Sequence, residues 1–223
     1  MHAVSEELEE LNKRIMALNR QGQVKEVEPL LLQASQLARQ EYGENHPSYA
    51  TVLNDLGGLY RTTGDYSKSE SFFLKAMQIL GDTAGKNHPG YATCINNLAG
   101  LYRLTKEYTR AEQLFLEAQD IYAKTIGEKN FLYASNLNNL ALLYQDMGKY
   151  EKAQELEERA LEIVRQTDGE NSNSYATSLG NLATVFLAKG NYEKAESLLQ
   201  QALGIFTNNV GTEHSLYISA LNS

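Results

Sequence analysis

The sequence predicts an all-α fold, a right-handed superhelical solenoid of stacked antiparallel helix hairpins. Three observations support this prediction: a repeat of 42 residues, an apolar spacing typical of helices within each repeat, and glycine or proline at the expected helix ends. One tyrosine column shows the period most plainly, and its members are Tyr49, Tyr91, Tyr133, Tyr175 and Tyr217.

Further columns keep the same period. They are a glycine column (Gly43, Gly85, Gly127, Gly169, Gly211), a leucine column (Leu56, Leu98, Leu140, Leu182), a second tyrosine column (Tyr66, Tyr108, Tyr150, Tyr192) and an alanine column (Ala76, Ala118, Ala160, Ala202). Chance does not align so many columns, so each block is one structural unit.

Each block divides into two expected helices. In the block that starts at Tyr49, apolar or small residues recur at the spacing of one helix face, from Leu53 to Tyr60. The turn around Gly64 follows, because glycine takes the positive φ that ends a helix. A second helix is expected from about Tyr66 to Thr83. His-Pro pairs, such as His88-Pro89, precede the first helices, where proline is tolerated.

Small residues mark the places where the two helices of a hairpin approach each other. They are Gly57, Ala99, Ala141 and Ala183 in the first helices and Ser69, Ala111, Ala153 and Ala195 in the second. Such residues let helix axes come within about 8 Å. The first block departs from this frame, with Arg14 in the leucine column and Ile15 in the small column, and we interpret it as a modified N-terminal cap.

This pattern of small and large residues resembles the tetratricopeptide repeat (TPR). The 42-residue period, residues 91–102 (Tyr-Ala-Thr-Cys-Ile-Asn-Asn-Leu-Ala-Gly-Leu-Tyr) and the Tyr-Glu-Lys-Ala motifs at residues 150–153 and 192–195 are similar to the kinesin-light-chain subtype. The resemblance covers essentially the whole chain. Similar repeats also occur in large multidomain bacterial proteins, so the subtype implies a fold and does not identify a kinesin cargo adaptor.

We expect residues 1–223 to form a single TPR domain. Its repeats span about residues 7–48, 49–90, 91–132, 133–174 and 175–216, and residues 217–223 begin a truncated sixth repeat. An unfinished hairpin would leave an apolar face uncovered, so we expect the chain to be a fragment of a longer protein.

The resemblance implies that the first helices line the inner wall of a groove. At about 100° per residue, the positions 2, 5, 9 and 12 after the leading tyrosine lie on a different face from the buried stripe. Asparagines at position 5 suit the backbone of an extended peptide, and arginines at position 12 suit acidic side chains or a terminal carboxylate. The candidate peptide-binding residues are Asn54, Arg61, Asn96, Arg103, Asn138 and Gln145.

Structural interpretations of the same residues remain open. The position-5 asparagines can be inter-helix hydrogen-bonding residues, and the next asparagines, Asn97, Asn139 and Asn181, are expected to be structural. Arg61 and Arg103 can pair with nearby acids such as Asp65 or Glu107. The Tyr60, Tyr102 and Tyr144 column is expected to belong to the core.

No residue pattern points to catalysis, a metal or a cofactor, and we expect none of them. His46 and His88 belong to helix-capping elements, and His2 and His214 lie near the termini. Cys94 has no histidine in register. Glu6-Glu7 and Glu157-Glu158 read as solvated helix faces. No glycine-rich phosphate loop is present, because the glycines outside the packing column read as helix ends.

The composition limits the classes of partner and the compartment that we expect for this protein. Lys and Arg total 20 against 28 Asp and Glu, a net charge of -8 that disfavours nucleic acid. No segment approaches the roughly 18 continuous apolar residues of a membrane span, and the acidic N-terminus is unlike a signal peptide. A single cysteine suits a reducing compartment, so we expect a cytoplasmic protein that does not bind membranes.

The expected function is a non-catalytic scaffold that binds a peptide or protein segment in the groove. The alternative is the sensing or regulatory half of a larger signalling or effector protein whose enzymatic domain lies beyond Ser223. A third expectation is self-association through the unfinished C-terminal face.

Overall fold

The computed structural model describes residues 6–210, and every regular element in that range is an α-helix. The all-α prediction is therefore confirmed. The truncated sixth repeat expected at residues 217–223 lies outside the described residues. The helices are α1 (Glu6–Arg20), α2 (Val24–Tyr42), α3 (Pro47–Thr63), α4 (Tyr66–Thr83), α5 (Pro89–Leu104), α6 (Tyr108–Thr125), α7 (Phe131–Asp146), α8 (Tyr150–Thr167), α9 (Asn173–Ala188) and α10 (Tyr192–Val210).

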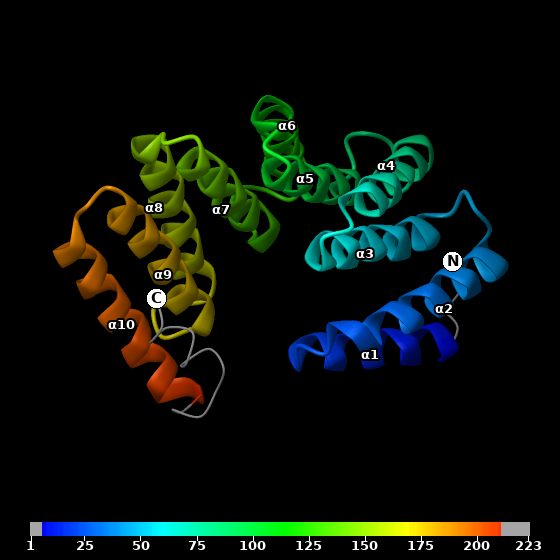
Figure 1. Cartoon of the computed structure of the whole chain (residues 1–223), viewed down its shortest axis with the longest axis horizontal. Coiled ribbons are helices and arrows are strands. Elements are labelled where there is room, and N and C mark those ends of the chain that lie inside the picture. Colours follow the sequence, from blue (N-terminus) through cyan, green and yellow to red (C-terminus); the bar gives the residue numbers. More distant parts are fainter. Residues whose placement is uncertain (1–5, 211–223) are drawn as a thin grey trace. The chain divides into compact units, whose positions relative to one another are not determined.

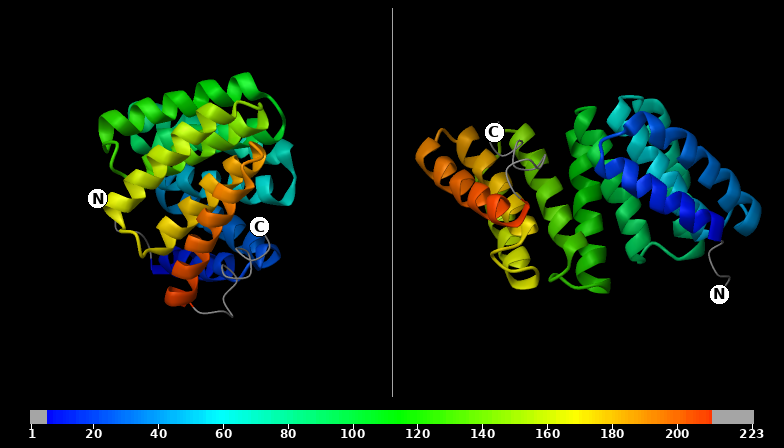
Figure 2. Two further views of the ribbon diagram at one scale, coloured as in Figure 1. Left: turned by 90° about the vertical axis from the view of Figure 1, so that its left-hand side faces the viewer. Right: turned by 90° about the horizontal axis from the view of Figure 1, so that it is seen from below.

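The chain divides into two compact units, residues 1–121 and 122–223, and the boundary falls within α6. In unit 1, α1 packs on α2 and α3 on α4 as hairpins, while α2 also packs on α3 and α4 on α5 (Figure 1). In unit 2, the hairpins α7–α8 and α9–α10 pack through α8 and α9 (Figure 2). Within each unit, neighbouring hairpins bury their apolar stripes against each other, as a repeat architecture requires.

The His-Pro elements cap the first helices, as predicted. The Nδ1 atom of His46 accepts a hydrogen bond from the backbone N–H of Ser48 at 3.1 Å. His88 does the same for Gly90 at 3.0 Å. Each histidine thereby satisfies one of the donors that a helix start leaves without an intrahelical partner.

The turns between paired helices need a residue in the left-handed backbone conformation, with positive φ. Gly64, Gly148 and Gly190 take φ values of 86°, 71° and 76°. The corresponding residue of the α5–α6 turn is Lys106, which takes φ 65° in the same column. A side chain in this region costs about 1–2 kcal/mol, so this turn is strained relative to the others.

The small residues permit close helix packing. A Cβ atom on Gly57 would lie 2.6 Å from the Phe73 ring, so a larger residue on α3 at this point would require the Phe73 ring on α4 to move. The hydroxyl of Ser69 donates to the carbonyl oxygen of Gly57 at 2.7 Å across the same hairpin. The equivalent Ala99, Ala141 and Ala183 are fully buried.

Buried tyrosines join successive hairpins of unit 1. Tyr60 is 7% exposed, and its hydroxyl donates to Glu28 on α2 at 2.8 Å. Tyr102 repeats the arrangement, donating to Glu70 on α4 at 2.7 Å. The core assignment of the Tyr60, Tyr102 and Tyr144 column is confirmed, because all three are buried.

The expectation of a solvated Glu157 is wrong. Its side chain is fully buried in α8, and neither carboxyl oxygen has a hydrogen-bond partner. Burial alone raises the pKa of Glu157 from 4.5 to about 8. Glu157 occupies the column held by Phe73 and Phe115, so the 42-residue period itself places it in the core, whereas Glu158 is exposed as expected.

The first hairpin differs from the others at its crossing point. Ile15 of α1 and Val27 of α2 fill the two columns that hold Gly, Ala or Ser in the later repeats, and both are buried. Two β-branched side chains at this position set a larger separation between helix axes than two small residues do. Arg14, in the leucine column, is exposed.

Candidate functional site

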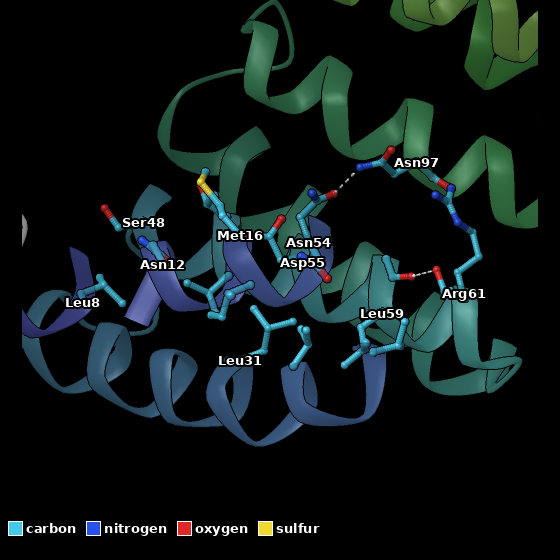
Figure 3. Close-up of a pocket in the computed structure, with 18 residues that line it drawn as sticks. Leu8, Asn12, Met16, Leu31, Ser48, Asn54, Asp55, Leu59, Arg61 and Asn97 are labelled. Atoms are coloured by element: carbon cyan, nitrogen blue, oxygen red, sulfur yellow. Dashed lines mark hydrogen bonds between the residues drawn. The ribbon is translucent and has the colours of Figure 1, made fainter. Parts of the chain in front are cut away.

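A pocket of about 660 Å³ opens in unit 1, on the side of the first helices α1 and α3. Its lining residues come from α1, α2 and α3, with Asn97 added from α5 (Figure 3). They are Leu8, Asn12, Ile15, Met16, Asn19, Val24, Val27, Leu31, Ser48, Thr51, Val52, Asn54, Asp55, Gly58, Leu59, Arg61, Thr62 and Asn97. The volume is within the range of about 300–1,000 Å³ typical of ligand pockets.

The pocket is apolar on one side and polar on the other. Leu8, Ile15, Leu31 and Leu59 are each at most 7% exposed and form apolar wall, whereas Met16 is 61% exposed. In Figure 3, Leu8, Asn12 and Ser48 lie toward one end, Arg61 and Asn97 toward the other, and Asn54 and Asp55 between them. An apolar cavity with a few polar groups is the usual composition of a binding site.

Three polar residues form a short chain of hydrogen bonds on the wall. The amide Nδ2 of Asn97 donates to Oδ1 of Asn54 at 3.0 Å. Because Oδ1 of Asn54 accepts from Asn97, the amide nitrogen of Asn54 is directed to its other partner, the carboxylate of Asp55. Asn97 therefore links α5 to α3, lines the pocket and orients a predicted groove residue.

Asp55 is the acidic group of the pocket. The crowded wall around its carboxylate raises the pKa of Asp55 to about 6, although its side chain is exposed at the surface, and the hydrogen bond from Asn54 acts in the opposite direction. Asp55 makes no ion pair with any of the described residues.

Arg61 closes the other end of the pocket. Its Nη1 donates to the backbone carbonyl of Asn97 at 3.2 Å. Burial and the nearby charge of Arg103 lower the pKa of the Arg61 guanidinium. The alternative pairing of Arg61 with Asp65 does not form, because Asp65 pairs with Lys68 at 3.0 Å.

Of the six predicted groove residues, the structure brings Asn54 and Arg61 into the pocket. Asn96 is 7% exposed on α5, and Arg103 is half-buried near the end of that helix. In unit 2, Asn138 and Gln145 are half-buried on α7, and Oε1 of Gln145 accepts from the Thr184 hydroxyl at 3.3 Å.

Sequence reasoning missed Asp55 and the apolar side of the pocket. One signal for Asp55 was present, because the column that holds Asn97, Asn139 and Asn181 holds an acid only in the repeat that starts at Tyr49. Met16 had a signal as well, because it stands at position 9 of the first block, on the face that the repeat pattern separates from the buried stripe.

The described residues offer little for covalent or metal chemistry. Cys94 is 2% exposed, and burial raises the pKa of its thiol to about 12, which keeps it protonated. Residues 6–210 contain no group of three His, Cys, Asp or Glu side chains placed to hold a metal ion. In the same range no helix is both long and apolar enough to cross a membrane.

Helix hairpins at a 42-residue period, with a binding-type pocket on their first helices, define a helical repeat protein. The chain belongs to the tetratricopeptide repeat family, whose model matches residues 8–82, 63–124 and 132–208. No curated protein sequence matches the chain significantly.

Solved structures agree with this assignment and include kinesin-light-chain-like repeat proteins. BtubC (BKLC) from P. vanneervenii has a TM-score of 0.72 and 26% identity, covering 93% of this chain and 82% of that one. A putative kinesin light chain of Podosopora anserina with TPR-like repeats has a TM-score of 0.69 and 23% identity, covering 92% and 98%. A Rap protein complexed with competence and sporulation factor has a TM-score of 0.78 and 13% identity, covering 97% and 63%.

Proposed function

We propose that this chain is a non-catalytic protein–protein interaction scaffold that binds an extended peptide or protein segment along the groove of its first helices. One observation carries the proposal: the pocket of about 660 Å³ lies on α1 and α3 and contains Asn54 and Arg61. Both residues belong to the columns that the repeat pattern assigns to the groove. Function on a repeat fold has to be argued from such a site, because the fold alone serves many partners.

Two further facts support the proposal. The tetratricopeptide repeat is generally a non-catalytic fold, and the Rap protein of similar fold is complexed with competence and sporulation factor. In unit 2, Asn138 and Gln145 on α7 lie in the same columns as Asn54 and Arg61. We extend the proposal to them, and to Asn96 and Arg103 on α5, as further groove residues.

The test compares partner capture by two surface variants. Thr62→Arg places a long side chain in the pocket, and Gln78→Arg makes the same change at an exposed site on α4 that does not line it. Partners captured from cell extract and identified by mass spectrometry are expected to disappear only with Thr62→Arg. Loss with Gln78→Arg alone would move recognition to the second helices and contradict the proposal. Circular dichroism and the melting temperature show that both variants are folded.

A further inference from the structure

We propose that the pocket between α1 and α3 takes an apolar side chain of an extended peptide and that Asp55 selects a basic residue beside that side chain. This inference rests on the proposed function and names the chemistry of the segment that is bound. It differs from the acidic ligand that the arginine column predicts. The argument uses the shape of the pocket, its apolar wall and its charges.

The apolar wall provides the anchor site. Leu8, Leu31 and Leu59 present aliphatic surface to the pocket from three different helices, and Met16 leaves a flexible thioether side chain 61% exposed at its edge. Methionine adapts its shape to different apolar partners. A leucine- or phenylalanine-sized side chain placed here would remove its own apolar surface and the exposed part of Met16 from water, which contributes about 25 cal/mol per Å² buried.

The opening of the pocket has a cause in the sequence. Ile15 and Val27 lie at the crossing of α1 and α2 and also line the pocket, in the two columns that are small in the other repeats. Larger side chains at a helix crossing set the two axes further apart than small residues do, so we infer that Ile15 and Val27 hold α1 and α2 apart and leave the space beside them. The anchor site is therefore specific to the first hairpin and is not a general feature of the repeat.

The charge of the pocket favours a basic neighbour for the anchor. Asp55 is reachable from solvent, makes no ion pair among the described residues, and lies on the wall beside Asn54 (Figure 3). A lysine or arginine of the ligand would compensate this carboxylate in a site where water is partly excluded.

The positive end of the pocket is less available. Arg61 lies six residues after Asp55, about 9 Å along the axis of α3. Arg61 is half-buried and its Nη1 is held by the carbonyl of Asn97, so fewer of its five N–H donors remain for an acidic ligand. Exposed Asn12 lies beside the anchor site and offers its amide group for the ligand backbone, whereas both amide atoms of half-buried Asn54 already bond Asn97 and Asp55.

The experiment follows methionine methyl groups by NMR. The chain has four methionines, of which Met16 lines the pocket, whereas Met77 and Met147 do not and serve as internal references. Protein carrying ¹³C-methyl methionine is titrated with four capped nonapeptides that differ only at two central positions: Leu-Lys, Leu-Glu, Leu-Gln and Ala-Lys. Leu-Lys is expected to bind tightest and to shift the Met16 methyl signal.

The expected preferences are modest and measurable. Replacing Leu by Ala in the peptide should weaken binding about tenfold, because most of an aliphatic side chain is lost from the pocket. Replacing Lys by Glu should weaken it roughly two- to fivefold, since the ion pair with Asp55 is partly exposed. Asp55→Asn should abolish the preference for Lys, and Asp55→Lys should reverse it. Asp82→Asn, an exposed charge change on α4, should leave it unchanged.

Each contrary result identifies what is wrong. A preference for Leu-Glu with a shifted Met16 would overturn the assignment of a basic ligand while leaving peptide binding on the first helices intact. Binding that shifts Met77 or Met147 and not Met16 would overturn the pocket as anchor site. If none of the peptides binds at millimolar concentration, the inference fails, whereas the scaffold function is tested separately by partner capture with Thr62→Arg.

Discussion

The side-chain amide of Asn97 donates a hydrogen bond to Oδ1 of Asn54, 43 residues earlier in the chain, at 3.0 Å. This bond links α5 to α3 on the side of the first helices, next to the bond from Arg61 to the Asn97 carbonyl. It joins one predicted groove residue to one predicted structural residue, so a single contact serves both the packing of two repeats and the wall of the pocket.

A double-mutant cycle on this pair should show coupling. Asn54→Ala and Asn97→Ala each remove the bond, and the double variant should be less destabilised than the sum of the two by about 0.5–1.5 kcal/mol. Urea unfolding measures the three free energies of unfolding. Additive effects would mean that the bond contributes nothing to stability.

The same contact should control the titration of Asp55. The pKa of Asp55 is about 6, raised by crowding and held back by the hydrogen bond from Asn54. Asn54→Ala should therefore raise this pKa further, and Asn97→Ala, which frees the Asn54 amide to rotate, should change it in the same direction. Carboxyl ¹³C chemical shifts measured against pH give the value. Asn181→Ala, in the Asn97 column on α9, is the control and should leave it unchanged.

Alanine substitutions at Gly57 and at its neighbour Gly58 form a matched pair that tests the close packing of α3 on α4. Gly57→Ala places a methyl group 2.6 Å from the Phe73 ring and should destabilise the protein by about 1–3 kcal/mol. Gly58→Ala meets nothing within 4 Å and should be stabilising by up to about 1 kcal/mol, because alanine favours the helix. Thermal or urea unfolding separates the two. Equal effects would show that the α3–α4 contact is looser than described.

Replacing Lys106 by glycine should stabilise the protein. Because its φ is 65°, Lys106→Gly should raise the free energy of unfolding by about 1 kcal/mol. The reciprocal change Gly148→Lys, in the equivalent turn where φ is 71°, should lower it by a similar amount. A destabilising Lys106→Gly would indicate that the lysine side chain contributes more than its backbone costs.

Glu157 should make stability depend on pH. Its pKa is about 8 in the folded protein against an ordinary 4.5, so the folded state holds the proton more tightly than the unfolded state. This residue therefore lowers stability as pH rises from about 4.5 to 8, by about 1.4 kcal/mol per pH unit, and the full penalty is present above pH 8.

The measurement is urea unfolding at pH 5 and pH 9. Glu157→Gln, which carries no charge, should gain stability relative to the native sequence at the higher pH by several kcal/mol and little at the lower pH. Glu158→Gln is the control, because Glu158 is exposed beside it. A difference between the native sequence and Glu157→Gln that does not change with pH would show that Glu157 reaches water or a partner.

The 42-residue period of the sequence made the fold predictable. Columns such as Tyr49, Leu56 and Gly64 each have a local physical reason, so their recurrence places helices, turns and core together. Lys106 and Glu157 break their columns, and the structure keeps both in the repeat conformation. The stacking of neighbouring hairpins therefore overrides the preference of an individual residue.

The site was less predictable. Helix geometry separated Asn54 and Arg61 from the buried stripe, and the resemblance to the tetratricopeptide repeat assigned their face to the groove; both residues line the pocket. The pocket itself depends on how far α1 lies from its neighbours, which follows from packing between helices. Ile15 was recognised as a departure, yet its effect on the space beside it emerges only in three dimensions.

Ile15 and Val27 also show how one repeat can differ in function from the others in the same array. These two residues determine whether the first hairpin leaves room beside it, and rim residues such as Asp55 determine what that room accepts. The shape of the pocket and its selectivity are thus set by different residues, so one can change without the other. We therefore expect that glycine and serine in place of Ile15 and Val27 would bring α1 and α2 together and reduce the cavity while leaving the repeat architecture intact.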